Sequence, residues 1–455
     1  MKSILILCTL ALSSVSGFAA PKPKAGALDL SKLVVVGDSL SAGVQNFSLL
    51  DSQQPFGYAN VVAQQAGATL VLPLIPSPGA PNVLELVTAG PPPVIGAKPG
   101  SLPWPPRDLD AQNDIPIATN VAVPGVTVGQ ALTLRPNPNA APDDPVAGWA
   151  NLVLGFPNPF YTGTGIPQTQ IEQAVALHPT TVIEWLGNND ALVPALFGQL
   201  DLLTQVDEFA KNYRAVLDAL SGTGATIITA NVPDITVVPY FTSAATIAAE
   251  KGVSIQLVEE QLGITANDYI RPSARAIADS ILSGKQSGPL PAICPTPPLP
   301  GMPIVPCVLN ASDAAKIRSA IACYNLIIAA ETSSHGGVMV DIHAWADQLY
   351  KKGYKIKSQE LTTDFLGGIF SLDGIHPDNT GYAIIANQFI DAINQAFKTK
   401  IPEADVAAIA AADPLVSRTS PGRKPHSGHS SPAPVNLNVC SIPQTNANVQ
   451  TSTIP

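Results

Sequence analysis

The sequence is poor in charge. Only 13% of its 455 residues are charged, and the formal net charge is −10. No stretch forms a basic patch, and a negatively charged chain is repelled by nucleic acid phosphates and by anionic lipid headgroups. We therefore expect no nucleic acid partner and no electrostatic docking on a membrane.

Long hydrophobic runs are also scarce. The apolar stretch from Ile4 to Leu12 is too short to span a bilayer, follows Lys2 and precedes the small residues of 17–20. This order is typical of a signal peptide, and we predict one over residues 1–20; a buried N-terminal helix is the alternative. No later run approaches a membrane span. The mature protein is expected to be soluble, secreted or periplasmic, with no obligate protein partner.

Cysteines and histidines number only five and six, and none has the spacing of a zinc site, so we expect no metal. One cysteine lies in the predicted signal peptide, and the other four allow three full pairings. Cys294 and Cys307 are the natural pair, because they share one proline-rich loop that a bridge would stabilise. Cys323 lies in a helical pattern and could simply be buried, and Cys440 lies in the tail.

Apolar residues make up 46% of the chain, which is ample for a core. Strand and helix patterns alternate, and this order predicts an α/β fold: a three-layer α/β/α sandwich with a parallel central sheet. The expected elements are strands at 33–36, 181–186, 225–232 and 338–342 and helices at 56–66, 206–220, 315–332 and, last, 381–397. The predicted domain spans 28–400, with insertions at about 76–109, 134–166 and 236–312, and a disordered Pro/Ser-rich tail at 413–455.

The first site candidate is the segment Gly37-Asp38-Ser39-Leu40-Ser41. It follows the first expected strand, and a serine at the carboxyl edge of an open α/β sheet lies where such sheets bind ligands. Ser39 is therefore a candidate nucleophile. The alternative is a turn in which Asp38 and Ser39 bond to their own backbone, and Asp38 fits that bracing role.

A candidate acid–base pair lies near the other end, in Asp373-Gly374-Ile375-His376-Pro377. An acid three residues before a histidine, in a turn made by glycine and proline, can orient the imidazole. A serine needs such a base at neutral pH, and the base needs a partner that fixes its tautomer. Ser39, Asp373 and His376 supply these three parts.

Two intermediate segments could stabilise an oxyanion. Gly125 ends the segment Asn120 to Gly125, and its bare backbone N–H could approach a reacting oxygen. Asn189 lies in Gly187-Asn188-Asn189-Asp190, directly after an expected strand, and its amide is a second candidate donor. Taken alone, both segments are equally typical of ordinary loops.

These four segments, in this order, resemble the sequence blocks of the GDSL esterases and lipases, members of the SGNH hydrolase superfamily. The resemblance implies that Ser39 is the nucleophile and that Asp373 and His376 complete the triad. It also implies an oxyanion hole made by the backbone N–H of Ser39, the N–H of Gly125 and the side-chain amide of Asn189. A Gly-x-Ser-x-Gly elbow, which the α/β-hydrolase fold uses, does not occur. Ser334-His335-Gly336-Gly337 is interpreted as a helix-ending turn.

The expected function is hydrolysis of a carboxylic ester, a fatty-acyl or lipid ester in particular, through an acyl-serine intermediate and without a cofactor. The alternatives are acyl transfer, carbohydrate deacetylation on the same scaffold, and a non-catalytic exported binding protein. The first two insertions carry Trp104, Phe156 and Phe160, which we predict to contact the acyl chain. Surface decoration or a partner site is the competing interpretation of these loops.

Overall fold

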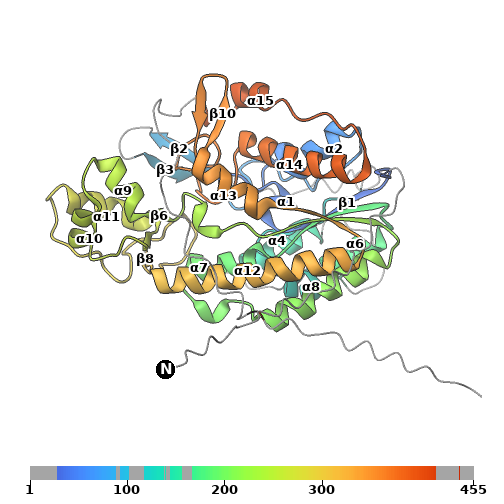
Figure 1. Cartoon of the computed structure of the whole chain (residues 1–455), viewed down its shortest axis with the longest axis horizontal. Helices are drawn as coiled ribbons and strands as arrows, with labels where there is room; N and C mark the ends of the chain where they lie inside the picture. Colours follow the sequence, from blue (N-terminus) through green and yellow to red (C-terminus); the bar gives the residue numbers. More distant parts are fainter. Residues whose placement is uncertain are drawn as a thin grey trace, which may run out of the picture.

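The computed structural model describes residues 28–88, 93–101, 117–137, 139, 144–155, 167–416 and 440. A parallel sheet of four strands, in the order β1-β4-β5-β9, forms its centre (Figure 1). The strands are β1 (Leu33–Gly37), β4 (Thr181–Trp185), β5 (Thr226–Ala230) and β9 (Val338–Val340). The segment after Thr119 runs parallel to β1 on its free edge, where Asn120 bridges to Val35. All carboxyl ends therefore meet at one edge of the sheet.

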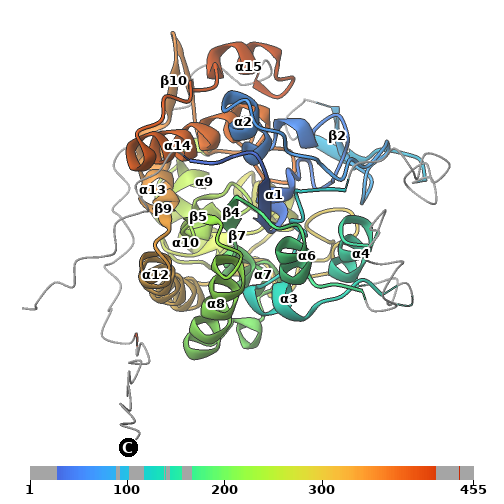
Figure 2. The same cartoon turned by 90° about the vertical axis from the view of Figure 1, so that its right-hand side faces the viewer.

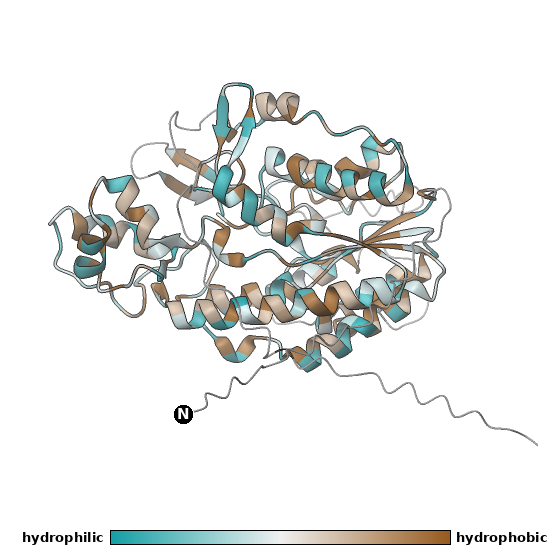
Figure 3. Cartoon of the chain, viewed as in Figure 1, coloured by the Kyte–Doolittle hydropathy of each residue, from teal (hydrophilic) through white to brown (hydrophobic). Residues whose placement is uncertain are grey.

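Side chains of β1 alternate between two apolar cores. Val34 and Val36 belong to one cluster of buried residues, and Leu33 and Val35 belong to another. Because successive strand side chains point to opposite faces, each face of the sheet has its own core. The strands are accordingly mostly apolar (Figure 3), as expected for a sheet covered on both sides.

Helices cover both faces and make the three-layer α/β/α sandwich that the sequence predicts (Figures 1 and 2). One face packs against α2 (Tyr58–Gln65) and α14 (Asn379–Phe397). The other packs against α3 (Val128–Thr133), α6 (Gln170–Ala176), α8 (Val206–Ser221) and α12 (Ala311–Ser334). The short elements around the sheet are α1 (Ser39–Ala42), η1 (Gln54–Phe56), α7 (Asn188–Phe197), η3 (Leu200–Leu202), η4 (Ile235–Val237) and α13 (Ile342–Lys352).

The insertions contain more regular structure than their proline and glycine content indicates. The first holds an antiparallel hairpin of β2 (Leu84–Thr88) and β3 (Val94–Ala97), and the second holds α4 (Pro145–Val153). Asp144 caps α4 and Pro145 opens it, which is the usual start of a helix. The interpretation of both stretches as irregular loops is therefore wrong for these residues.

The third insertion, 236–312, builds a small unit with its own core beside the sandwich (Figure 1). Its helices are α9 (Ala244–Lys251), α10 (Ile255–Leu262) and α11 (Pro272–Leu282), and its strands are β6 (Thr242–Ser243), β7 (Tyr269–Ile270) and β8 (Val308–Leu309). The predicted disulfide between Cys294 and Cys307 closes a loop of this unit. Both sulfurs are buried in its core.

The C-terminal region needs a correction. After the hairpin of β10 (Tyr354–Ile356) and β11 (Gln359–Leu361), α14 is not the last helix, since α15 (Val406–Ala412) follows it. Asp413, the predicted start of a free tail, is buried and accepts hydrogen bonds from the backbone and hydroxyl of Thr380. Cys440 forms a disulfide with Cys323 on α12. The domain therefore extends past Asp413, and Cys440 is bonded to α12.

Candidate active site

Ser39 lies directly after β1, as the first residue of the one-turn helix α1. Gly37 permits this sharp turn, because a Cβ there would lie 2.2 Å from the Ser41 hydroxyl. Asp38 caps α1 by accepting the Leu40 N–H at 3.0 Å. Asp38 thus stabilises this turn. The backbone N–H of Ser39 stands at the helix start and has no partner inside the helix.

His376 lies between Ser39 and Asp373. Its Nε2 is 2.8 Å from the Ser39 hydroxyl oxygen, and its Nδ1 is 2.9 Å from Oδ2 of Asp373. All three residues are buried, and Ser39 and His376 keep 8% and 7% of their surface exposed. The structure therefore joins two segments 337 positions apart through one imidazole. In this geometry an Nδ1–H donor to the carboxylate leaves Nε2 free to accept the serine proton.

Asp373 is surrounded by donors. Oδ1 accepts the backbone N–H groups of Ile375 and His376, and Oδ2 accepts that of Phe47 at 2.6 Å, besides the imidazole. Burial raises the pKa of this carboxyl, but the charge of the neighbouring His376 and these hydrogen bonds outweigh burial and hold the pKa below its usual value. Asp373 is therefore held as a carboxylate.

The second and third segments contact each other. The Asn189 side-chain amide donates to the Val126 carbonyl at 3.0 Å, next to Gly125. Asp190 accepts the backbone N–H of Val128 and the Thr204 hydroxyl. Burial raises the pKa of Asp190 to about 6, although those hydrogen bonds oppose it. Gly125 has φ +83°, a left-handed conformation that favours glycine.

Three contributors to the site were missed from the sequence. Asn188 donates to Oδ2 of Asp38 at 2.9 Å and ties the third segment to the first. Phe47 supplies the backbone N–H on Asp373. Trp149 on α4 packs against Gly125, with its indole N–H donated to the Ala80 carbonyl at 3.0 Å. Two of the three carried a sequence signal: Asn188 is the variable position of the Gly-x-Asn-Asp motif, and Trp149 is one of the aromatic residues of the second insertion.

The predicted acyl-chain residues Trp104, Phe156 and Phe160 lie outside the described residues, as does the predicted signal peptide. In the described ranges no helix is long and apolar enough to cross a membrane. Within the same ranges, no group of three or more His, Cys, Asp or Glu side chains is placed to hold a metal ion.

A second serine, histidine and aspartate lie together on the far side of the sandwich. Ser334 ends α12, His335 caps it, and Gly336 follows with φ +67°, so the predicted helix-ending turn is confirmed. The His335 Nδ1 is 3.1 Å from the Ser334 hydroxyl, and its Nε2 is 2.9 Å from Asp218.

No protein-family model matches the sequence, and a search of curated proteins finds no match. Among solved structures, the chain is similar to LAE5, an alpha/beta hydrolase enzyme from the metagenome of Lake Arreo, Spain, at 15% identity and a TM-score of 0.33, over 82% of this chain and 98% of that one. It is also similar to a mutant of Axe2, an acetyl-xylooligosaccharide esterase from Geobacillus, at 12% identity and a TM-score of 0.36, over 83% and 98% of the two chains. Likenesses this distant do not define a substrate.

Proposed function

We propose that the chain is a serine esterase that cleaves carboxylic esters through an acyl-serine intermediate, as a GDSL-type hydrolase. The single observation that carries this proposal is the hydrogen-bonded line from Ser39 through His376 to Asp373. A buried serine is inert by itself, but an imidazole within 2.8 Å whose tautomer is fixed by a carboxylate makes it a nucleophile.

In the proposed reaction the Ser39 oxygen attacks the ester carbonyl while His376 takes the serine proton. The carbonyl oxygen then carries negative charge and is stabilised by the N–H groups of Ser39 and Gly125 and by the Asn189 amide. His376 returns its proton to the departing alcohol, which leaves an acyl-Ser39 ester. Water, deprotonated by His376, attacks this ester; the bond to Ser39 then breaks, the acid leaves, and His376 returns the proton to the Ser39 oxygen.

The acyl preference is part of the proposal. The described wall next to Gly125 is apolar, because Val146 and Trp149 of α4 pack directly against it. Apolar walls of this kind favour an apolar acyl group over a sugar. The triad itself would serve acyl transfer equally well, so the preference for water over a second alcohol has to be measured.

Export is proposed as well. The first residues have the pattern of a signal peptide, and the described residues contain two disulfides, which persist in oxidising compartments. Mass analysis of the protein purified from culture medium or periplasm tests it, and an intact N-terminus would contradict it.

The test of the activity is incubation with nitrophenyl esters of acyl chains from acetyl to palmitoyl, with glycerol as a competing acceptor. We expect nitrophenol release that saturates with substrate and favours the longer chains, with free acid as the product. A preference for acetyl would contradict the apolar acyl pocket, and acylglycerol as the main product would favour the transferase. No release with any ester would contradict the esterase proposal.

A further inference from the structure

Arg271 is a buried cation that forms no ion pair with a carboxylate in the part of the chain that the structure describes, although the charge of Asp313 favours its charged form from further away. Its side chain is fully buried between the insertion unit and the sandwich. Nη1 donates to the Pro306 carbonyl at 2.8 Å, Nη2 donates to the Ala195 carbonyl at 2.6 Å, and Nε has no partner. Burial lowers the pKa of Arg271 to about 10, which leaves it charged at neutral pH. A buried charge is costly, so its placement calls for a reason.

The Ala195 carbonyl lies in the last turn of α7, where carbonyls lack an N–H donor from the helix itself. This helix begins with Asn188 and Asn189. The Gly198 and Gln199 N–H groups both donate to the Pro194 carbonyl rather than to that of Ala195. A cation at a helix C-terminus satisfies such a carbonyl and complements the helix dipole. Arg271 therefore terminates α7 from outside the sandwich.

α7 needs an external support because Pro194 lies inside it. Proline has no N–H to give to the Asp190 carbonyl, and this carbonyl is instead 3.4 Å from the Thr204 N–H. The helix thus lacks one of its few internal bonds at the turn that follows Asn189. Its position depends more than usual on what holds its two ends.

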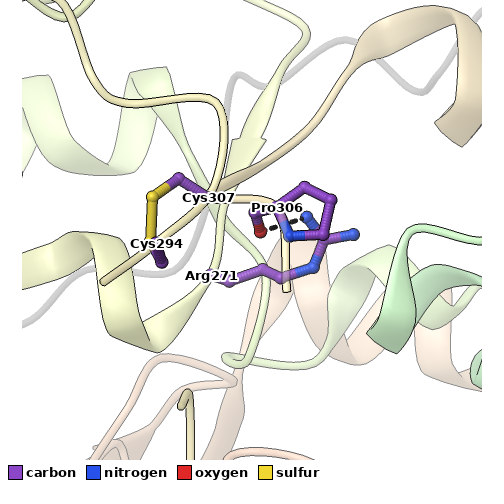
Figure 4. The surroundings of a disulfide bond; sticks show 4 residues. All are labelled: Arg271, Cys294, Pro306 and Cys307. Carbon is purple, nitrogen blue, oxygen red and sulfur yellow. Dashed lines mark hydrogen bonds between the residues drawn. A yellow bond between two sulfur atoms is a disulfide. The ribbon is translucent and has the colours of Figure 1, made fainter. Parts of the chain in front are cut away.

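The disulfide loop fixes the other side of Arg271. The backbone N–H of Arg271 donates to the Cys307 carbonyl, and Pro306 precedes this cysteine, which is bonded to Cys294 (Figure 4). Pro306 also packs on the end of α7, because a Cβ at Gly198 would lie 2.9 Å from its ring. The bridge therefore holds the carbonyl that orients Arg271.

We infer that Arg271, held by the Cys294–Cys307 loop, is a positioning residue that fixes α7 and thereby the donor amide of Asn189. The inference rests on the proposed function. The same insertion also reaches the triad, since the Tyr240 N–H donates to the Gly374 carbonyl at 2.9 Å. The third insertion thus supports both the Asn189 segment and the segment of Asp373 and His376.

A double-mutant cycle between Arg271 and Asn189 separates positioning from general stability. We expect Arg271→Met to lower kcat about 10-fold with KM unchanged, since small misplacements of a donor act in the transition state. In the Asn189→Ala background the same change should cost less than about 2-fold. Arg271→Lys keeps a cation and a hydrogen-bond donor, so its kcat should fall less than that of Arg271→Met. If Arg271→Met does not fold, as judged by circular dichroism, Arg271→Lys carries the cycle. Equal losses in both backgrounds would overturn the inference.

The two disulfides give a matched control. Replacing Cys294 and Cys307 by alanine should lower kcat by the same mechanism, and the loss should again shrink to less than about 2-fold in the Asn189→Ala background. Replacing Cys323 and Cys440 should leave kcat unchanged, because that bridge joins α12 to the tail and does not hold the Pro306 and Ala195 carbonyls that bind Arg271. Similar kcat losses from both pairs would overturn the inference. The esterase proposal would stand in every case if the wild type cleaves ester and Asn189→Ala alone lowers kcat.

Discussion

Two groups of serine, histidine and aspartate lie in the described part of the molecule, and of these two only one has the geometry of a catalytic triad. In the first, the two imidazole nitrogens of His376 have different partners, Asp373 on Nδ1 and Ser39 on Nε2. In the second, His335 Nδ1 is 2.7 Å from the Glu331 carbonyl. A carbonyl can only accept, so that nitrogen carries the proton and cannot take one from Ser334.

Burial separates the two groups further. The Asp373 side chain is fully buried, whereas that of Asp218 is 65% exposed and its charge is screened by water. Ser39 begins a helix, where backbone N–H groups are free, and Ser334 ends one, where free carbonyls repel an oxyanion. Contact between a serine, a histidine and an aspartate is therefore not sufficient for a catalytic triad. The partner of each imidazole nitrogen and the end of the helix at which the serine lies also matter.

The largest effect should come from the two serines. We expect Ser39→Ala to lower ester turnover by about 10⁴-fold or more, because the attacking oxygen is lost. Ser334→Ala should change turnover less than about 2-fold, since its hydroxyl donates to the Glu331 carbonyl and serves only the helix end. Turnover with saturating nitrophenyl ester checks both. Near-normal turnover in a folded Ser39→Ala variant would contradict the comparison.

The two aspartates should differ next. Asp373→Asn should lower kcat by about 10³–10⁴-fold, because an amide nitrogen among four N–H donors forces a wrong imidazole tautomer. The matched change Asp218→Asn should leave kcat unaffected. Steady-state kinetics of both purified variants tests the pair, and similar kcat values for the two would remove the distinction between them.

The proposed oxyanion donor Asn189 belongs to only one of the groups, and Asn189→Ala tests its role. We expect kcat to fall about 10²–10³-fold with little change in KM, since the donor acts mainly in the transition state. Asn325→Ala is the control, because it also removes an amide side chain, but one that is hydrogen-bonded to the backbone of Val232. A change confined to KM would mean that Asn189 binds the ground state.

The smallest expected effect concerns a buried carboxyl without a histidine. Glu184 on β4 accepts hydrogen bonds from the Tyr213 hydroxyl and the Leu186 N–H, and burial raises its pKa from 4.5 to about 8. The folded state therefore binds the proton more tightly than the unfolded state, so the free energy of unfolding falls as pH rises from about 5 to about 8.

Glu184→Gln removes this titration and should make the free energy of unfolding fall less over that range. Urea unfolding at both pH values measures it, with the exposed Glu360→Gln as control. An equally steep fall in the Glu184→Gln variant would show that another group is responsible.

The sequence predicted the parts of the site that are local, and missed those that depend on tertiary contacts. Ser39, Asp373 and His376 lie in short motifs with turn residues, and the strand β1 is a continuous apolar run. The sequence therefore predicted the three candidate residues and the strand. Arg271 and Phe47 act on carbonyl and carboxylate groups far away in the chain, and no local pattern marks them. The pairing of Cys440 with Cys323 was left open for the same reason, because spacing alone does not fix which cysteines meet.

The predictions for the insertions failed for a different reason. Proline and glycine correctly indicated turns, but β2, β3 and α4 form between those turns because their apolar residues find partners on the sandwich. α15 was missed because its alanine-rich sequence has little periodicity, and its docking depends on the contact with α14.

The most direct measurement is covalent labelling with a fluorophosphonate ester, followed by mass mapping of the peptides. The reagent phosphonylates a serine that a neighbouring base has activated, so it reads the Ser39–His376 contact without assuming a substrate. The account predicts one label per chain, on Ser39, and loss of labelling in a folded His376→Ala variant. Labelling of Ser334, or of no serine at all in the folded protein, would contradict it.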